Sequence, residues 1–219
     1  MLRLLFEKKG NAIWISHLDL MRLFQRAFKR AGLMLTHTQG YNPRPSVSIA
    51  LPLSVGVESC CELLDFELEG ETVSCDEICS RLNDALVEGV RVLRVYEDGY
   101  KLKHLAYLDA QLELEYDGGA DEKTADSIRA LFAREQLTVE KKGKNGITQQ
   151  DIIPMIRRLS VKKLPDREVE IVALHSCQNP SLNPMQLSAA ITKYLPALAP
   201  DYVRCFREEI YDTNEMIFR

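Results

Sequence analysis

Residues 16–55 read SHLDLMRLFQRAFKRAGLMLTHTQGYNPRPSVSIALPLSV, and this stretch decides the predicted fold because it joins a helix to a strand. Ser16 followed three residues later by Asp19 is the pattern of a capping box, which begins a helix, and Gly32 is a typical helix end. From Ser46 to Val55, apolar residues alternate with small or polar ones, which predicts a strand with one buried face. The other face carries only Ser, Ala and Pro, so a ligand can approach the backbone there.

The predicted helix has an apolar face and a basic face. We expect its apolar residues to pack into the core. They are Leu18, Leu20, Met21, Phe24, Phe28 and Ala31. The basic face carries Arg22, Arg26 and Arg30, which recur every four residues and therefore lie on one side of a helix.

Outward from this stretch, the first half has the predicted order βαββαβ. Residues 1–8 and 64–68 alternate as strands, a capping pattern at Ser74 begins a helix that ends near Gly89, and residues 90–96 form a further strand. This is the ferredoxin-like order.

The second half repeats this order loosely. Residues 141–166 do not fit the repeat, and we interpret them as a basic insertion with a short helix at 152–159. The other predicted elements are strands at 108–116, 136–141, 169–173 and 203–211, and helices from Asp121 and from Asn183.

These patterns predict an α+β fold of two tandem ferredoxin-like (βαββαβ) halves, each an antiparallel sheet with helices on one face. The N-terminal domain is residues 1–100 and contains the basic first helix. The C-terminal domain is residues 101–219 and contains the basic insertion 141–166. The boundary is expected near 99–104.

The composition is that of an ordinary globular protein, with 46% hydrophobic and 27% charged residues. No apolar run approaches the ~18 residues that a membrane helix needs, so we expect no membrane contact. The start, MLRLLFEKKG, becomes charged before a signal-peptide core can form. We therefore predict a cytoplasmic protein.

The six cysteines do not indicate a metal centre or a disulfide framework. Cys75 and Cys79 have a C-x3-C spacing, but they continue with Ile78 and Leu82 along one apolar face of a helix. No other group of Cys and His has a ligand spacing. We predict no metal and no cofactor in this chain.

Positive charge is concentrated in the first fifty residues, although the whole chain has a net charge of −4. Residues 1–50 hold eight Lys and Arg against two acids, whereas residues 51–100 hold three against twelve. A chain polarised in this way indicates an anionic partner. We interpret the stripe Arg22, Arg26 and Arg30 as a phosphate-binding face; the alternative is an ordinary solvated face.

The run QGYNPRP at 39–45 predicts a rigid turn because it contains two prolines. An aromatic residue beside amides and a guanidinium is a usual combination for stacking on a nucleotide and reading it. We take Gln39, Tyr41, Asn42 and Arg44 as candidate nucleic-acid contacts. The alternative is a plain rigid connection.

His17 lies in the first helical turn, where its ring can face the open N-terminus, a place that favours anions. We include it among the nucleic-acid contacts; the alternative is a surface or packed histidine. The sequence contains no Ser/His/Asp set, phosphate loop or dinucleotide motif. His17 is therefore the candidate for a general acid or base, while capping accounts for Asp19.

The segment SHLDLMRLFQRAFKRAGL, together with the later QGYNPRPSVSIALPLSVGVES, resembles a bacterial family of radical SAM-linked proteins. The resemblance covers most of the chain, and it is strongest over 14–68 and weaker after 140. Such proteins are encoded beside a radical SAM enzyme or fused to its C-terminus. The resemblance implies a partner that carries an iron–sulfur cluster and S-adenosylmethionine, because this chain lacks the three-cysteine motif for such a cluster.

The predicted architecture is also similar to the repeat-associated RNA-binding proteins of CRISPR systems, some of which are ribonucleases. We expect an RNA-binding accessory module that presents a structured RNA, tRNA or rRNA, to a radical SAM partner and has no catalytic activity alone. The basic stretch 141–163 would extend the grip on RNA. Two alternatives are a metal-independent ribonuclease that uses His17, and a protein–protein adaptor that docks through the acidic segment 58–88 without RNA contact.

Overall fold

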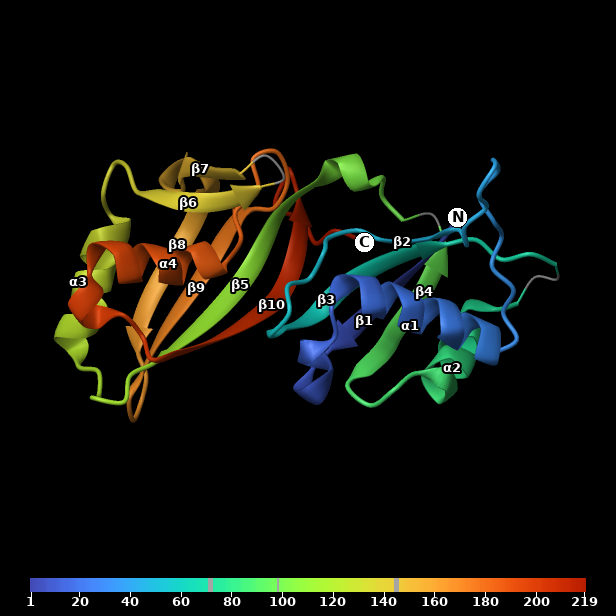
Figure 1. Ribbon diagram of the computed structural model, residues 1–219, viewed down its shortest axis with the longest axis horizontal. Helices are drawn as coiled ribbons and strands as arrows, with labels where there is room; N and C mark the ends of the chain where they lie inside the picture. The colour runs from blue at the N-terminus through green and yellow to red at the C-terminus, as the bar shows by residue number, and fades with distance from the viewer. Residues whose placement is uncertain (71–72, 98, 144–145) are drawn as a thin grey trace. The chain divides into compact units, whose positions relative to one another are not determined.

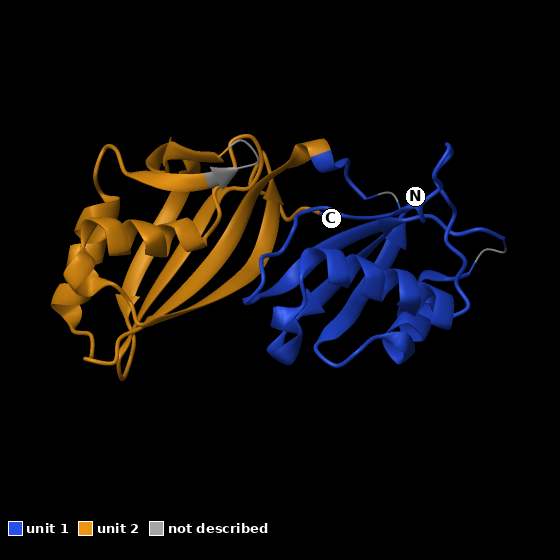
Figure 2. Ribbon diagram, viewed as in Figure 1, with its two compact units in different colours: residues 1–102, 219 blue, residues 103–218 orange. Residues whose placement is uncertain are grey.

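The computed structural model describes residues 1–70, 73–97, 99–143 and 146–219. It divides into two compact units, Met1–Leu102 with Arg219 as unit 1 and Lys103–Phe218 as unit 2 (Figure 2). Within the described ranges the fold is mixed α+β with four α-helices, and the strands within each unit pair in antiparallel fashion. In that part of the chain, no helix has both the length and the apolar character needed to cross a bilayer.

Unit 1 has the chain order βαββαβ, and its strands lie in the order β4-β1-β3-β2 (Figure 1). Leu4 of β1 lies opposite Leu64 of β3 and Val95 of β4. The predicted helix start is confirmed, because the Ser16 side chain accepts a hydrogen bond from the backbone N–H of Asp19 at 3.3 Å. The elements are β1 (Leu2–Lys8), the 3-10 helix η1 (Gly10–Trp14), α1 (His17–Arg30), β2 (Val47–Ile49), β3 (Val57–Phe66), α2 (Cys75–Ala85) and β4 (Val90–Glu97).

Unit 2 places its strands in the order β10-β5-β9-β8, with β6 and β7 paired as a separate hairpin. Helices α3 and α4 contact each other, and α3 also contacts β8. The 3-10 helix η2 (Leu102–His104) stands where the units divide. The elements are β5 (Leu105–Glu115), α3 (Glu122–Phe132), β6 (Thr138–Gly143), β7 (Gly146–Asp151), η3 (Ile153–Met155), β8 (Ile156–Lys163), β9 (Glu168–Ser176), α4 (Met185–Tyr194), η4 (Pro196–Leu198) and β10 (Tyr202–Asp212).

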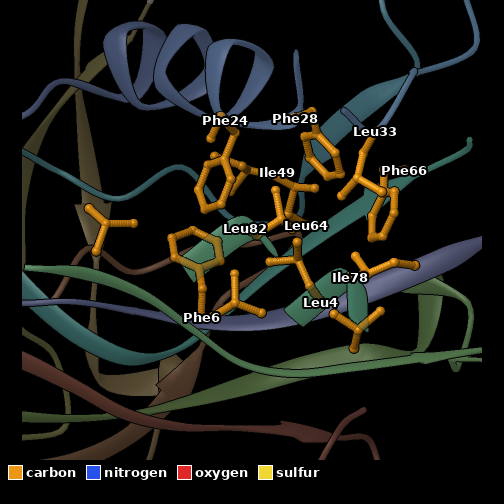
Figure 3. Packing of buried hydrophobic residues seen from close by; sticks show 14 of the residues in the cluster. Leu4, Phe6, Phe24, Phe28, Leu33, Ile49, Leu64, Phe66, Ile78 and Leu82 are labelled. Atoms are coloured by element: carbon orange, nitrogen blue, oxygen red, sulfur yellow. The ribbon is translucent and has the colours of Figure 1, made fainter. Parts of the chain in front are cut away.

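The core of unit 1 decides which face of α1 meets solvent. Phe24 of α1 packs edge-on against Phe6 of β1, and Phe28 packs against Phe66 of β3, each with ring centroids 4.8 Å apart (Figure 3). Residues of α2 join the same cluster, so both helices cover one face of the sheet. The prediction that Leu18 is buried is wrong: it is 66% exposed, because the apolar face begins at Leu20 instead.

The strand predicted for residues 46–55 is shorter in the structure. β2 holds only Val47–Ile49, and it pairs with β3. Pro52 has no N–H to donate to a ladder, which is a physical reason for the strand to stop before it. Leu53 remains buried, but Val55 is 52% exposed. The alternation therefore predicted burial correctly at Leu53, and was wrong about Val55 and about the length of the strand.

The helix predicted for 152–159 is also wrong. After the single turn η3, residues 156–163 form strand β8, in which Ile156 lies opposite His175 and Val161 opposite Ile171 of β9. Pairing with β9 satisfies the backbone groups along one edge of this segment, and such tertiary pairing overrides a local helical pattern. The described part of 141–166 therefore holds the end of β6, then β7 and then the sheet strand β8 where the helix was predicted.

Candidate functional site

A hollow on the outer side of α1 collects the three arginines of the basic stripe. It has a volume of about 440 Å³, and it lies between α1 and the turn that follows α2. Because the buried residues of α1 fill the opposite face, the four-residue spacing directs these arginines away from the core. We call this site the α1 hollow, and its lining is Ile15, Asp19, Arg22, Leu23, Arg26, Arg30 and Val87.

The three arginines differ in their partners. Arg22 forms an exposed ion pair with Asp19 at 2.9 Å, and Arg30 donates a hydrogen bond to the carbonyl oxygen of Ala85 at the end of α2. Arg26 makes no hydrogen bond or ion pair with any residue that the structure describes. The α1 hollow therefore contains three cations and one carboxylate, and one of the cations is available to a ligand.

Asp19 supports the helix and does not cancel the positive charge of the hollow. Ser16 donates a hydrogen bond to its carboxylate at 2.8 Å, and this bond lowers the pKa of Asp19, with further lowering by Arg22 and Arg26. Asp19 thus stays ionised at neutral pH, fixes Arg22 and leaves the hollow with excess positive charge. Asp19 lies in the first turn of α1 as predicted, but its carboxylate accepts from the Ser16 hydroxyl and not from the Ser16 backbone N–H that a full capping box would use.

Part of the lining of the α1 hollow is apolar. Ile15, Leu23 and Val87 contribute to it together with the arginines. The buried Lys8 donates a hydrogen bond from Nζ to the carbonyl oxygen of Ile15 at 3.0 Å, which fixes the chain at this edge. A lining with both cationic and apolar side chains suits a ligand that has both anionic groups and flat apolar parts. The sequence reasoning missed Val87, because this residue reaches the lining only through tertiary packing.

The predicted turn 39–45 forms the tip of a separate exposed loop. The N–H of Thr38 donates to the carbonyl oxygen of Arg44 at 2.8 Å, and the Arg44 N–H donates back to Thr38 Oγ1 at 3.0 Å. These bonds close the loop and leave the Tyr41 side chain fully exposed. Gln39, Tyr41, Asn42 and Arg44 are all exposed, and none of them lines the α1 hollow. The structure thus brings the three helix arginines together but keeps the loop residues apart from them.

His17 is close to the α1 hollow in sequence but is not part of its lining. Its ring Nδ1 is buried and has no hydrogen-bond partner within the described ranges. An acid–base pair with His17 is therefore not formed by the described side chains. The same ranges contain no group of three or more His, Cys, Asp or Glu arranged to hold a metal ion.

A second hollow in unit 2 also contains three arginines. It lies between α3 and β8, and its volume is about 480 Å³. Arg158 pairs with Glu215 at 2.5 Å and Arg157 with the same carboxylate at 3.3 Å. Arg129 pairs with Glu122 at 2.9 Å and with Asp126 at 2.5 Å. We call this site the β8 hollow, and its lining is Arg129, Phe132, Ala133, Ile153, Ile156, Arg157, Arg158, Leu159, Ser160 and Val161.

The predicted basic stretch 141–163 is thus partly neutralised by acids from elsewhere in unit 2. Lys144 and Asn145, at its predicted tip, lie outside the described residues. Lys141 donates hydrogen bonds to the carbonyl oxygen and the hydroxyl of Ser181. A shared grip on RNA by this stretch stays a prediction.

Comparisons with known proteins support the fold and give the family. No curated protein matches the chain. A chain in a structure described as "Crystal Structure of a Cbf5-Nop10-Gar1 Complex" has a similar fold, with a TM-score of 0.52, 8% identity, and coverage of 95% of this chain and 48% of that chain. The present chain thus spans about half the length of that protein. The "Crystal Structure of an Unknown Protein from Galdieria sulphuraria" aligns at 12% identity over 94% and 96% of the two chains, but with a TM-score of only 0.26.

The family match is more direct than these likenesses. Residues 1–184 match a bacterial family described as "Uncharacterized protein conserved in bacteria (DUF2344)". The matched region contains Met1–Leu102 of unit 1, including both the α1 hollow and the loop 39–45. The description does not bear on a radical SAM partner. The chain belongs to this bacterial family, DUF2344.

Proposed function

We propose that this protein is an RNA-binding accessory module and that the α1 hollow is its phosphate-binding site. The observation that carries the proposal is Arg26, a cation without a hydrogen-bond or ion-pair partner among the described residues, in a hollow that Arg22, Arg30 and three apolar residues also line. Guanidinium groups bind phosphate oxygens through paired N–H donors. Three of them along one helix match the repeating negative charge of a nucleic-acid backbone.

The finer form of the proposal is that the module presents a structured RNA, tRNA or rRNA, to a radical SAM enzyme. The support for this partner is the resemblance of residues 14–68 to radical SAM-linked proteins. The partner would hold the iron–sulfur cluster and S-adenosylmethionine, and this chain would supply binding and orientation of the RNA. The acidic segment 58–88 is the proposed docking surface in the adaptor alternative, which dispenses with RNA.

We further propose that each unit is a ferredoxin-like half, with domains 1–100 and 101–219. The strand order β4-β1-β3-β2 in unit 1 supports this, as does the corresponding order β10-β5-β9-β8 in unit 2 once the β6–β7 hairpin is set aside as an insertion. In both units, the first strand of the order βαββαβ is central and the last is next to it.

The exposed loop would contact RNA at a second place. Gln39, Tyr41, Asn42 and Arg44 are all accessible, and the loop that carries them is closed by its own hydrogen bonds. A rigid loop with an exposed aromatic side chain can receive a base at little entropic cost. His17 would lie close to the backbone path at the N-terminal end of α1.

The test compares RNA binding by the wild type, Arg26→Glu and a matched control, Arg91→Glu. Arg91 is an exposed arginine of β4 and does not line the α1 hollow. Total cellular tRNA and rRNA fragments serve as probes in a filter-binding assay at low salt. We expect Arg26→Glu to lose affinity at least tenfold, because the change removes a charge-assisted contact and adds repulsion, with a contact worth ~1.5–3 kcal/mol. Arg91→Glu should bind like the wild type.

The same samples discriminate between the alternatives. RNA cleavage without added metal that disappears in His17→Ala, while binding persists, would establish the ribonuclease. Negligible RNA affinity at low salt, or equal effects of the Arg26 and Arg91 changes, would refute the phosphate site. The adaptor would then be the better explanation, to be tested by direct binding to a purified radical SAM enzyme.

A further inference from the structure

The tryptophan at position 14 is the only one in the chain, and most of its side chain is exposed to solvent. It is the last residue of η1, and it immediately precedes Ile15, which lines the hollow. Trp14 is 62% exposed. A tryptophan usually buries most of its large apolar surface, so exposure to this extent requires an explanation.

The backbone next to Trp14 is hydrogen-bonded to the segment before β3. The N–H of Gly56 donates a hydrogen bond to the carbonyl oxygen of Ile13 at 2.9 Å, which ties η1 to the chain before β3. A Cβ atom at Gly56 would lie 3.6 Å from Cζ3 of Trp14, so the ring borders the backbone there. Gly56 has a φ of +83°, a conformation that glycine adopts without strain. The backbone that carries Trp14 is thus tied to the segment before β3.

Two further exposed apolar side chains come from the same part of unit 1. Leu18 is 66% exposed and lies one helical turn before Arg22, and Val55, next to Gly56, is 52% exposed. An aromatic ring with apolar neighbours, followed along the helix by guanidinium groups, is the arrangement that binds single-stranded nucleic acid. Bases stack on the ring while the backbone follows the cations.

We propose that Trp14 is the stacking platform for an unpaired base of the RNA whose phosphates occupy the α1 hollow. The inference rests on the proposed function and gives it a substrate class, single-stranded or bulged RNA rather than a continuous duplex. A duplex keeps its bases stacked on one another, so it can satisfy the arginines but cannot offer a free base face to an indole. A protein partner that covers Trp14 is the competing explanation.

The fluorescence of Trp14 reports directly on contacts with its ring, because all indole emission of the chain comes from this position. We would titrate the full chain with a short oligouridylate, with an RNA duplex of equal length and with inorganic polyphosphate, and follow both emission and protection from acrylamide quenching. Affinities would be measured in parallel by filter binding. The oligouridylate should change the emission and shield the ring, with the same midpoint as in filter binding. Polyphosphate should bind without either change.

Substitutions of Trp14 separate the contribution of base stacking to RNA affinity from that of charge. Trp14→Ala should lower affinity for the oligouridylate by roughly 5- to 150-fold, the usual loss of one stacked base, and should leave the slope of affinity against salt unchanged. Trp14→Phe should retain most of the affinity. Tyr100→Ala is the matched control, because Tyr100 is a 63% exposed aromatic residue of unit 1 that does not line the hollow. Circular dichroism and urea unfolding would verify that each variant is folded.

Failure of this inference is distinguishable from failure of the proposed function. If Arg22→Glu with Arg26→Glu weakens RNA binding but saturating RNA leaves the Trp14 emission unchanged, the phosphate site stands and the stacking proposal is overturned. Equal affinity for duplex and single strand, or no effect of Trp14→Ala in a folded protein, also overturns it. If no RNA binds and a purified radical SAM enzyme shields Trp14 from acrylamide, both proposals fail and the surface is a protein interface.

Discussion

The α1 hollow and the β8 hollow are similar in size and contain the same number of arginines, yet they differ in local charge. Their volumes are about 440 and 480 Å³, and each is lined by three arginines. In the β8 hollow every arginine is paired with a carboxylate, from Glu122, Asp126 or Glu215. In the α1 hollow Asp19 is the single carboxylate of the lining.

This difference shows that nearby acids, more than the number of arginines, determine whether a group of arginines can bind phosphate. Exposed ion pairs contribute little to stability, but they occupy the donors that a phosphate would need and cancel the field that attracts it. On α1 the carboxylate of Asp19 pairs with Arg22 and not with Arg26, two helical turns away, whereas packing supplies Glu215 to both Arg157 and Arg158. We therefore expect the two hollows to respond differently to the same changes.

The largest contrast is expected from charge reversal in each hollow. Arg22→Glu with Arg26→Glu should weaken single-stranded RNA binding by about 100-fold, since two charge-assisted contacts at ~1.5 kcal/mol each are lost. The slope of log affinity against log salt should fall by ~0.7 for each phosphate released. Arg157→Glu with Arg158→Glu should change RNA affinity little. Filter binding across a salt series measures both effects, and equal losses from the two double variants would break the comparison.

A second contrast concerns pH, because unit 2 buries a titratable group next to β8. His175 of β9 is fully buried opposite Ile156, and burial lowers its pKa to about 4 from the usual 6.5. The unfolded chain therefore binds a proton that the folded chain excludes. The contribution of neutral His175 to the free energy of unfolding is complete above pH ~6.5, and it is lost as the pH falls toward ~4. Between pH 7 and pH 5 the free energy of unfolding should drop by about 2 kcal/mol from this group.

Urea unfolding followed by circular dichroism at each pH measures this loss, and His175→Leu should remove most of the dependence. The α1 hollow should behave differently, because guanidinium groups stay charged over this range and the pKa of Asp19 is already lowered. RNA affinity of the folded protein should thus be nearly constant from pH 5.5 to 8. An unfolding free energy that does not change with pH, or that changes equally in His175→Leu, would contradict the assignment.

The third test compares the α1 hollow with the exposed loop of the same unit. Tyr41→Ala should cost ~1 kcal/mol of RNA binding, the lower end of the range for one stacked base, because the ring is fully exposed and has no supporting neighbours. Tyr41→Phe should retain the affinity, and neither change should alter the salt slope. A loss as large as that of the arginine reversals would mean that the loop, rather than the hollow, is the main contact.

The smallest effect is expected from removing an acid of the β8 hollow, which tests whether ion pairing keeps that hollow from binding RNA. Glu215→Gln removes the carboxylate that holds Arg157 and Arg158. RNA affinity at low salt should rise a few-fold, and the salt slope should steepen by ~0.7 if one more phosphate is bound. Filter binding at two salt concentrations suffices for the measurement. Unchanged affinity would show that ion pairing is not what keeps the β8 hollow from binding RNA.

The sequence predicted best those features whose signals are local. The capping residues Ser16, Ser74 and Asp121 each begin a helix where expected, because a side chain that accepts a bond from the first helical turn acts within a few residues. The prediction for Cys75 and Cys79 as part of an apolar helix face was also good, since Ile78 and Leu82 beside them are fully buried. Element ends were less predictable, as the short β2 and the strand β8 demonstrate.

By itself, then, the sequence determined the main buried face of α1, because a period of 3.6 residues places Leu20, Phe24 and Phe28 on one side, although it placed Leu18 there wrongly. It determined that Arg22, Arg26 and Arg30 form a stripe. Tertiary structure alone decided which positive charges remain available, because the neutralising carboxylate Glu215 is distant in sequence from Arg157 and Arg158. Packing likewise brought Val87 into the lining of the α1 hollow and left Trp14, next to Ile15 in the chain, exposed to solvent. Periodicity is a property of one segment, whereas charge balance and exposure depend on every segment that folds against it.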